Sequence, residues 1–513
     1  MTILLLLCAI PAAAQGARII AADMHATAGP RDMAWQFCVG AGHAALLLNP
    51  ANLAQLKQVH RDIGFRYVRF HGILSDEMGV YNVVNGAPFY DFSKVDALYG
   101  SILGAGMRPF VELSFMPSAL ASGDQTVFDW KTNVTPPADL SKWEGLIGAF
   151  ASHLVSRFGY SEVEHWRFEV WNEPNLAGFW QGADQDAYFR LYDATAVALK
   201  SVDASLPVGG PASAGTGWID DFIAHLDAAH MPADFISTHT YGSYGGFMDD
   251  QGQADVKLIP GPDAIAADVK RVRDQVAASK RPELPVDFTE WNSSYSQRDP
   301  MHDSYFSAAY ILDKIKRSEG MAEALSYWTY SDLFEEEGPP PAAFYGGFGL
   351  ITRDGIEKPA YFAYKYLNAL GPMLLADADP QSWLTADAAG DFTALIWDFS
   401  QPAQESSDRP FFSKDHPSEA LPAVALTVNS LAPGKYVFTI HRTGYRHNDA
   451  YSQVIAWANP KDLAPDQIAT LRQQTNDAPE TATTVSVDSS GTFSASIPMN
   501  TNDVVLVALT RVR

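Results

Sequence analysis

Two carboxylates in this sequence stand at the ends of apolar runs, where a chain rarely places an ionisable group. Glu173 lies in "VWNEPN" and Glu290 lies well downstream in "DFTEWNSS". A retaining glycosidase uses two carboxyl groups about 5 Å apart. One stays protonated and donates to the leaving oxygen, while the other stays ionised and attacks the anomeric carbon. The two residues therefore predict this chemistry, provided that the fold brings them together.

Polar and aromatic neighbours suit the same chemistry. Asn172, beside Glu173, can donate a hydrogen bond to a sugar 2-hydroxyl. His239 and Tyr241, at the end of another apolar run, can hydrogen-bond Glu290 and keep it anionic. Trp328 offers a floor for the apolar face of a sugar ring.

Other chemistries lack their motifs. The sequence contains no H-x-H, H-E-x-x-H or Cys-x-x-Cys spacing for a metal. The Gly-rich "YGSYGG" (241–246) does not open a helix after a strand, and no G-x-S-x-G elbow occurs. A lone Glu at a strand end is usually solvated or ion-paired, and a lone His is usually a satisfied core residue. The interpretation therefore depends on the whole set, and no metal or organic cofactor is expected.

The elements that must position these residues alternate along the chain. We expect strands at 35–40, 66–72, 108–115, 165–172, 206–213, 234–241, 284–292 and 324–332. We expect helices at 51–63, 141–158, 184–203, 217–230, 262–280, 302–319 and 359–370. Eight strands that alternate with helical segments predict an α/β fold, the (β/α)8 TIM barrel.

The polar residues fall where such a barrel carries its chemistry. They gather at the carboxyl ends of the expected strands: Arg69, His71, Glu112, Asn172, Glu173, His239, Tyr241, Glu290 and Trp328. Active sites of these barrels lie at that end. The pattern thus predicts one shared site.

Domain boundaries follow from a change of pattern. The barrel is expected over residues 30–372, with a proline-rich loop at 335–349 on the active-site rim. Alternating apolar runs with Gly, Pro, Asn and Asp turns predict an appended C-terminal antiparallel β-sandwich over 375–513. Residues 15–29 are a candidate extra strand of that sandwich.

Composition restricts the partners. Sixty acidic residues against 36 basic ones give a net charge of −24, which disfavours nucleic acid and anionic membranes. The 47% hydrophobic content supplies a packed core, and the 12% aromatic content suits a small carbohydrate ligand. A homo-oligomer remains open.

The first residues indicate export. "MTILLLLCAIPAAAQG" has a short apolar run and a small-residue cleavage motif at Ala12–Ala14, which predicts a signal peptide over residues 1–14. No Lys or Arg precedes the run, which leaves open a true start upstream of Met1. Cys38 is then the only cysteine left, as in a periplasmic or secreted protein without an internal disulfide.

Several motifs together resemble glycoside hydrolase family 39, the β-xylosidase and α-L-iduronidase family. The resemblance rests on "RFHG", "FMPSALASG", "WNEPN", "HTYG", "TEWNSS", "YWTYSDLFEEEG" and "GGFGL", and runs from about residue 35 to 370. It continues loosely into "HRTGYRHNDAYSQVIAWANP". "WNEP" alone is shared across the wider clan, whereas its combination with "TEWNSS" and "SDLFEE" is more specific.

The resemblance implies roles for individual residues. Glu173 matches the general acid/base and Glu290 the nucleophile of a double displacement, on strands 4 and 7 of the barrel. The implied pocket for the terminal sugar contains Arg69, His71, Asn172, His239, Tyr241, Tyr295 and Glu336. Glu335 and Glu337 are adjacent alternatives to Glu336.

The substrate is expected to be a neutral sugar. Basic residues near the expected mouth are few, chiefly Arg69 and Arg353, and "FEEE" adds acid beside it. β-Xylosidase is therefore the first choice. β-Glucosidase, α-L-arabinopyranosidase and an α-L-iduronidase-like activity stay open, as does a carbohydrate-binding protein that has lost turnover.

Overall fold

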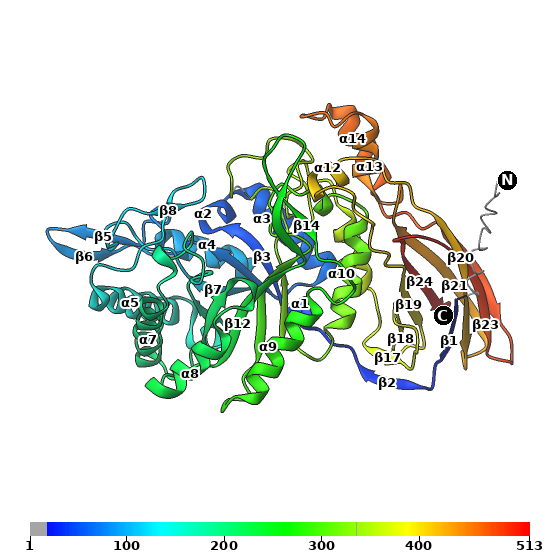
Figure 1. Ribbon diagram of the computed structural model, residues 1–513. Coiled ribbons are helices and arrows are strands. Elements are labelled where there is room, and N and C mark those ends of the chain that lie inside the picture. Colours follow the sequence, from blue (N-terminus) through cyan, green and yellow to red (C-terminus); the bar gives the residue numbers. More distant parts are fainter. Residues whose placement is uncertain (1–17, 335) are drawn as a thin grey trace, which may run out of the picture.

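The computed structural model describes residues 18–334 and 336–513. The predicted signal peptide at 1–14 lies outside them. Eight parallel strands close into a barrel in chain order (Figure 1). They are β3 (Cys38–His43), β4 (Tyr67–His71), β7 (Arg108–Leu113), β10 (Arg167–Val170), β11 (Val208–Ser213), β12 (Phe235–Tyr241), β15 (Val286–Asn292) and β16 (Ala324–Tyr327). The predicted TIM barrel is confirmed.

Helices surround this barrel. They are α1 (Ala34–Phe37), α2 (Ala44–Leu47), α3 (Pro50–Ile63), α4 (Ser93–Gly104), α5 (Leu140–Phe158), α6 (Tyr160–Val163), α7 (Gln185–Val202), α8 (Ile219–Ala229), α9 (Ala266–Ala278), α10 (Phe306–Arg317) and α11 (Pro359–Asn368). The sequence analysis did not expect α4. No helix in the described part of the chain is long and apolar enough to cross a bilayer.

Local sequence sets the ends of these elements. The side chain of Asn49 caps the amino end of α3 by accepting from the Ala51 N–H, and Pro50 occupies the first turn, which needs no N–H there. Gly64 ends the same helix with φ 84°, a conformation that favours glycine. The chain is thereby turned directly into β4, which carries Arg69 and His71.

The first strand lies three residues later than predicted. Residues 34–37 form the short helix α1, and the strand, which was predicted to end at Gly40, continues through Gly42 to His43. Both glycines are required by aromatic rings packed on the strand. A Cβ on Gly40 would lie 2.3 Å from Trp328, and one on Gly42 would lie 2.2 Å from Phe334.

Loops at the carboxyl end of the barrel carry three hairpins that the sequence analysis did not identify. They are β5–β6 (Tyr81–Val84, Ala87–Tyr90), β8–β9 (Thr126–Val127, Thr132–Asn133) and β13–β14 (Ser243–Met248, Ala254–Leu258). At the opposite end, Arg167 lies 4.5 Å from the Phe37 ring centroid and forms an ion pair with Asp287. Because these groups close that end, the carboxyl end is left for a site.

The C-terminal region forms two sheets beside the barrel (Figure 1). The smaller sheet contains β1 (Ile19–Asp23), β20 (Ala420–Asn429) and β23 (Phe493–Asn500). The larger contains β2 (Thr27–Pro30), β17 (Met373–Leu375), β18 (Ser382–Ala386), β19 (Phe392–Trp397), β24 (Val504–Arg511), β21 (Gly434–Thr443) and β22 (Thr481–Val487). The N-terminal strands β1 and β2 lie among the C-terminal ones, and β1 pairs with β20 in parallel, unlike its antiparallel neighbours.

Short helices also belong to this region, although none was predicted there. They are α12 (Asp408–Phe412), α13 (Ala450–Ala456) and α14 (Pro465–Gln474). A hydrophobic core fills the space between the two sheets, and a larger core lies between the barrel strands and their helices. These are the two largest hydrophobic cores of the described residues, and the candidate site lies above the barrel core.

Candidate active site

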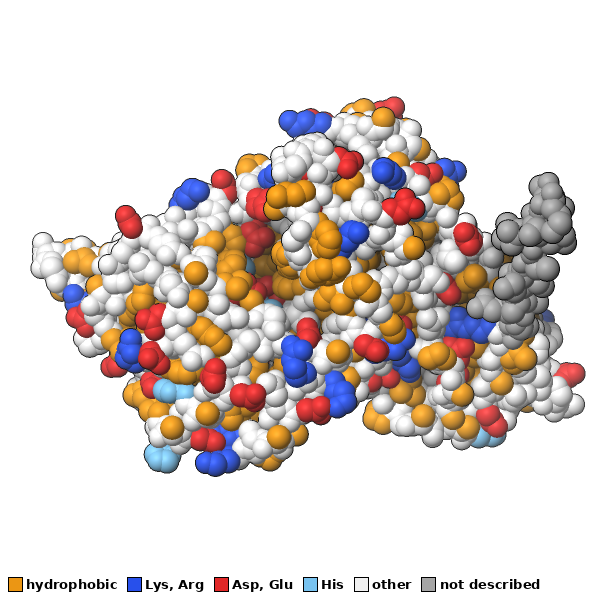
Figure 2. Space-filling model, viewed as in Figure 1, with side chains coloured by type: hydrophobic (Ala, Val, Ile, Leu, Met, Phe, Trp, Pro, Cys, Tyr) orange, Lys and Arg blue, Asp and Glu red, His pale blue; other side chains and the backbone are white. Residues whose placement is uncertain are grey.

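A cavity of about 420 Å³ opens at the carboxyl end of the barrel. Figure 2 shows acidic side chains inside a hollow on this face, with apolar side chains around it. The lining residues are His71, Asn172, Glu173, Leu176, Phe179, Ala214, Gly215, Tyr241, Ser243, Asp268, Glu290, Tyr295, Trp328, Glu336 and Phe348. Eight of them were predicted from the sequence to bind sugar or to catalyse, whereas the predicted Arg69 and His239 do not line the cavity.

The backbone after β10 directs Glu173 into this cavity. Trp171 and Glu173 have positive φ angles of 73° and 46°, a conformation that costs energy for residues other than glycine. Two hydrogen bonds hold the turn: Glu173 N donates to the Ala212 carbonyl over 2.8 Å, and the Trp171 indole N–H donates to the Phe179 carbonyl over 2.8 Å. The polar end of this apolar strand is thus a fixed turn.

Glu290 lies within β15 and is held by two donors. Arg69 Nη1 donates to its Oε1 over 2.6 Å, and the Tyr241 hydroxyl donates to its Oε2 over 2.7 Å. Hydrogen bonds of this kind stabilise the charged form of a carboxylate. The two donors around Glu290 therefore suit an ionised carboxylate.

Glu173 and Glu290 face each other across the cavity. His239 Nδ1 lies 2.9 Å from Glu173 Oε1 and 3.5 Å from Glu290 Oε2. One oxygen of each carboxyl group and the imidazole nitrogen all lie within 4.8 Å of one another. This proximity suits the short separation of a retaining pair and leaves too little room for the water of an inverting pair.

The two carboxyl groups differ in their surroundings. Burial raises the pKa of Glu173 to about 7, although the nearby charges of His71 and Arg69 oppose the rise. Among the described residues, no Lys or Arg lies within ion-pair distance of Glu173, and its one such neighbour is the imidazole of His239. Burial also lowers the pKa of His239 to about 4, which leaves that ring neutral near pH 7. Glu173 can therefore carry a proton where Glu290 carries a charge.

Arg69 lies beneath the cavity and does not line it, which corrects its prediction as a sugar contact. Its guanidinium is fully buried, donates to Glu169 over 2.5 Å and to Glu290 over 2.6 Å, and forms an ion pair with Glu112 over 2.8 Å. It also donates to the Asn172 side-chain oxygen over 2.9 Å, so the amide nitrogen of Asn172 remains for a sugar hydroxyl. Arg69 thus orders the groups that do face the cavity.

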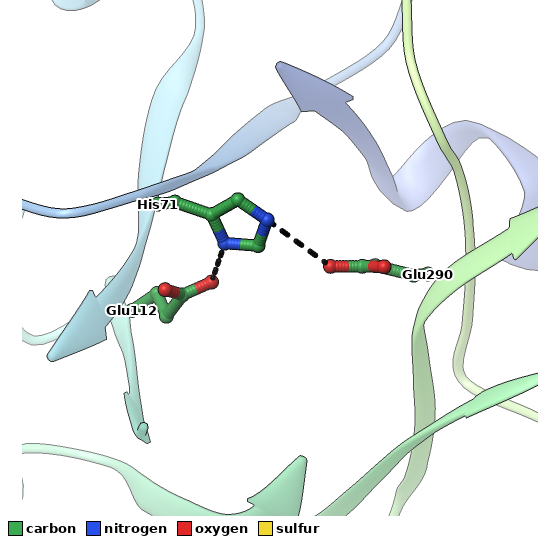
Figure 3. Close-up of side chains that lie close together, drawn as sticks. All are labelled: His71, Glu112 and Glu290. Atoms are coloured by element: carbon green, nitrogen blue, oxygen red, sulfur yellow. Dashed lines mark hydrogen bonds and ion pairs between the residues drawn. The ribbon is translucent and has the colours of Figure 1, made fainter. Parts of the chain in front are cut away.

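His71 lines the cavity, and its ring lies between the carboxyl groups of Glu112 and Glu290 (Figure 3). Its Nδ1 lies 2.8 Å from Glu112 Oε2, and its Nε2 lies 3.8 Å from Glu290 Oε1. Burial is outweighed in Glu112 by the charges of Arg69 and His71, which lower its pKa. The Glu112 carboxylate therefore fixes the direction of the His71 ring.

His239 was also predicted to contact the sugar. It is fully buried behind the two carboxyl groups and does not line the cavity. Its hydrogen bond goes to Glu173 and not to Glu290 as predicted, because Glu290 Oε2 lies farther away, at 3.5 Å. We therefore describe it as a bridge between the carboxyl groups.

The remaining predicted residues form walls and rim. The Trp328 ring is buried 4.7 Å from the ring of His71. Tyr295 is 47% exposed at the rim, edge-on to Tyr241. Glu336 lines the cavity, and burial together with the charges of the two central carboxyl groups raises its pKa well above the ordinary range.

Glu335 and Glu337, which precede and follow Glu336 in the sequence, were the alternatives to it. Glu337 forms an ion pair with Arg298 over 3.3 Å and is mostly exposed, while Glu335 is outside the described residues. Arg353, expected near the mouth, bonds Asp462 over 2.6 Å and does not line the cavity. Of the alternatives that can be placed, Glu336 is the one that faces the site.

Sequence reasoning did not assign a role to Glu112 or Glu169. Glu169 accepts from Arg69 and from the Thr289 hydroxyl over 2.7 Å. Its only signal was a carboxylate inside the apolar run "RFEVWN", two residues before Trp171. Leu176, Phe179, Ser243 and Asp268 gave no signal at all, because the sequence does not reveal that their loop, hairpin strand and helix start approach the cavity.

Two groups of side chains could in principle hold a cation. They are His71, Glu112 and Glu290, and Glu173, His239 and Glu290. Both include Glu290, which Arg69 already contacts, and Arg69 contacts Glu112 as well. The guanidinium therefore already supplies positive charge to these carboxylates.

The chain is similar to known proteins over most of its length. A family described as "Glycosyl hydrolases family 39" matches residues 19–494. A β-xylosidase of Geobacillus stearothermophilus is 45% identical over 371 residues, which are 71% of this chain and 73% of that protein. The crystal structure of a monomeric β-xylosidase from Caulobacter crescentus CB15 has a TM-score of 0.95 at 47% identity, and covers 97% of this chain and 100% of that one. The GH39 enzyme from Xanthomonas axonopodis pv. citri has a TM-score of 0.96 at 45% identity, with 98% and 100% covered.

Proposed function

Because this chain belongs to glycosyl hydrolase family 39 and is a glycosidase, we propose that it is a retaining, exo-acting β-xylosidase. The observation that carries the proposal is the pair Glu173 and Glu290, whose oxygens lie within 4.8 Å. Their unequal surroundings assign one as acid and the other as nucleophile. Similarity to β-xylosidases supports the choice of sugar.

The proposed reaction is a double displacement. Glu290 attacks the anomeric carbon while Glu173 donates its proton to the leaving oxygen, which gives a covalent glycosyl-enzyme. Glu173, now ionised, then takes a proton from water, and the oxygen of that water attacks the same carbon and releases Glu290. Arg69 and Tyr241 hold the Glu290 side chain in position during both steps. They stabilise its carboxylate again when the glycosyl-enzyme is hydrolysed. Asn172 is placed to donate to the 2-hydroxyl.

A neutral sugar fits the charges of the cavity. Its described lining contains no Lys or Arg, whereas four acidic residues face it: Glu173, Asp268, Glu290 and Glu336. A uronide carboxylate would be repelled by these groups and would find no cationic partner on the described walls. This charge pattern favours a xyloside over an iduronide.

A panel of aryl glycosides tests the proposal. We expect the highest kcat/KM on p-nitrophenyl β-xyloside, with lower values on the β-glucoside, the α-L-arabinopyranoside and an α-L-iduronide. Glu290→Ala should abolish release from all of them. A faster reaction on another glycoside would change the proposed substrate, and no wild-type release from any glycoside would leave only a carbohydrate-binding role.

We also propose that the chain is exported. The motif before Gln15 supports removal of residues 1–14. The intact mass of protein isolated from the periplasm or medium should correspond to a chain that starts at Gln15. Recovery of the unprocessed chain from the cytoplasm alone would contradict export.

A further inference from the structure

Glu336 reaches the cavity from a loop, and contacts with other parts of the barrel decide where that loop lies. The strand before it, β16, ends at Tyr327, and the helix after it, α11, begins only at Pro359. Glu336 nevertheless lines the cavity beside the two central carboxyl groups. The groups that hold the backbone of Glu336 therefore help to shape the site.

The Glu336 carboxyl group lies in unfavourable surroundings. Burial and the charges of Glu290 and Glu173 raise its pKa well above the ordinary range. Among the described residues no Lys or Arg forms an ion pair with it, whereas the next residue, Glu337, is paired with Arg298. A carboxyl group in such surroundings would gain free energy by turning toward water. The backbone that carries it must therefore be held in place.

Gln297 holds this backbone on both sides of Glu336. Its side-chain nitrogen donates to the Phe334 carbonyl over 3.2 Å, and its side-chain oxygen accepts from the Glu337 N–H over 2.8 Å. The two bonds use the donor and the acceptor of one planar amide group. The residues before and after Glu336 are thereby fixed relative to each other.

Gln297 itself does not face the substrate. It is 2% exposed and does not line the cavity. It lies in the segment after β15, the strand that carries Glu290. Its amide therefore connects the backbone around Glu336 to the strand of the proposed nucleophile.

The hairpin β8–β9 supplies one further contact to the same loop. The Asp129 N–H donates to the Glu336 carbonyl over 3.0 Å, and a Cβ on Gly338 would lie 3.3 Å from the Asp129 carboxyl carbon. A single hydrogen bond lets the backbone pivot about it. The two bonds of Gln297 remove that freedom.

We propose that Gln297 is a positioning residue for the reaction: its amide fixes the backbone around Glu336 and thereby directs the Glu336 carboxyl group toward the sugar. Gln297 contacts neither the sugar nor the two central carboxyl groups. The inference rests on the proposed function, because it takes Glu336 to be a sugar contact. It adds that a buried amide outside the cavity determines how well that contact is made.

A double-mutant cycle with Glu336 tests the proposal, on the aryl glycoside that the wild type hydrolyses fastest. Gln297→Met approximately conserves the side-chain volume and removes both hydrogen bonds. Because a small displacement of a contact can slow a reaction strongly, Gln297→Met should lower kcat/KM about 10- to 100-fold. In the Glu336→Ala background the positioned carboxyl group is absent, so Gln297→Met should lower kcat/KM by less than about twofold.

Gln297→Glu is the conservative variant. Its side chain has the same length and can accept from the Glu337 N–H, and when protonated it also donates to the Phe334 carbonyl. It should therefore lose less activity than Gln297→Met, and its kcat/KM relative to the wild type should rise as the pH falls. A Gln297→Glu variant no more active than Gln297→Met at any pH would show that these hydrogen bonds do not matter.

Gln55→Met is the matched control. Gln55 is a buried amide on α3 that donates to the Thr352 carbonyl over 3.0 Å and accepts from the Ser331 hydroxyl over 2.5 Å. It does not line the cavity. Gln55→Met should lower Tm as Gln297→Met does, while kcat/KM stays at the wild-type value.

The outcomes separate this inference from the proposed function. Equal losses from Gln297→Met with and without Glu336 would show a general structural role and overturn the inference, as would an unchanged kcat/KM. Glu336→Ala with wild-type activity would also overturn it, because no contact would remain to be positioned, and the proposed function would stand. If the wild type hydrolyses no glycoside, the proposed function is wrong and the inference falls with it.

Discussion

Glu173 and Glu290 have the same side chain, and their different neighbours give them different tasks. Glu290 accepts from Arg69 and Tyr241, so its charge is stabilised. Glu173 is buried beside a neutral imidazole, so its proton is retained. Neither assignment follows from residue type alone.

The pH dependence of the reaction should report Glu173. Because its pKa is about 7 and the first step needs its proton, kcat/KM for xylobiose should fall about tenfold per pH unit above that value. Glu173→Gln should react far more slowly, and its basic limb should disappear. A basic limb that persists unchanged in this variant would show that another group supplies the proton.

Arg69 compensates three buried carboxylates, Glu112, Glu169 and Glu290. Arg69→Met should lower the free energy of unfolding by about 3–5 kcal/mol, because charges are left buried without a partner. Arg190→Met, at an exposed position of α7, should change it by less than about 0.5 kcal/mol. Urea denaturation of the three proteins measures both changes, and equal changes would remove Arg69 from this role.

Among the elements, strand β3 is constrained by a side chain of the cavity wall, Trp328, which packs against it. Gly40 is the position at which the Trp328 indole lies against the barrel. Gly40→Ala should displace that ring, lower the free energy of unfolding by about 1–3 kcal/mol and reduce kcat/KM on p-nitrophenyl β-xyloside. Both readouts should move together because Trp328 also lines the cavity.

Gly148→Ala in α5 is the control for that variant. A Cβ there meets no atom within 4 Å. Alanine should therefore raise the free energy of unfolding by about 0.5–1 kcal/mol through its better helix propensity, with unchanged activity. Gly40→Ala as active and stable as the wild type would mean that the indole is not held by this contact.

Strand β16 ends five residues earlier than predicted. Six of the other seven barrel strands were predictable to within two residues at each end, because each is a short apolar run before a polar residue. The position of β3 was not, since Gly40 and Gly42 are explained only by rings from distant residues. The carboxylate pair was predictable because Glu173 closely follows β10 and Glu290 lies near the carboxyl end of β15. Glu169 was not, because its partners Arg69 and Thr289 are far away in sequence.

At the scale of the whole molecule, the C-terminal region also contacts the rim of the site. The segment between β19 and β20 packs α12 against the hairpin β13–β14, which carries Ser243. Arg409 forms an ion pair with Asp249 over 2.6 Å, and the Leu258 N–H donates to Asp408 over 3.2 Å. The β-sandwich region thereby supports a cavity wall.

This contact should make stability depend on pH. Burial, together with the adjacent Asp299, raises the pKa of Asp408 well above its ordinary value. The folded protein therefore keeps a proton that the unfolded chain releases above about pH 4, so this group lowers stability as pH rises, by at most about 1.4 kcal/mol per pH unit. Asp408→Asn should flatten the fall of Tm between pH 5 and 8.

Asp250→Asn, at an exposed position of the hairpin turn, serves as the control and should follow the wild-type curve. Differential scanning calorimetry across this pH range provides the comparison. Parallel curves for wild type and Asp408→Asn would show that the Asp299–Asp408 contact does not govern the dependence.

The most direct test of the account is to trap the glycosyl-enzyme. 2,4-Dinitrophenyl 2-deoxy-2-fluoro-β-xyloside should inactivate the protein with release of one dinitrophenolate, and peptide mass spectrometry should find the fluoroxylosyl group on Glu290. Glu290→Ala should not be labelled. Attachment to another residue, or hydrolysis of xylosides with inversion and no covalent adduct, would contradict the assignment of Glu290 and Glu173.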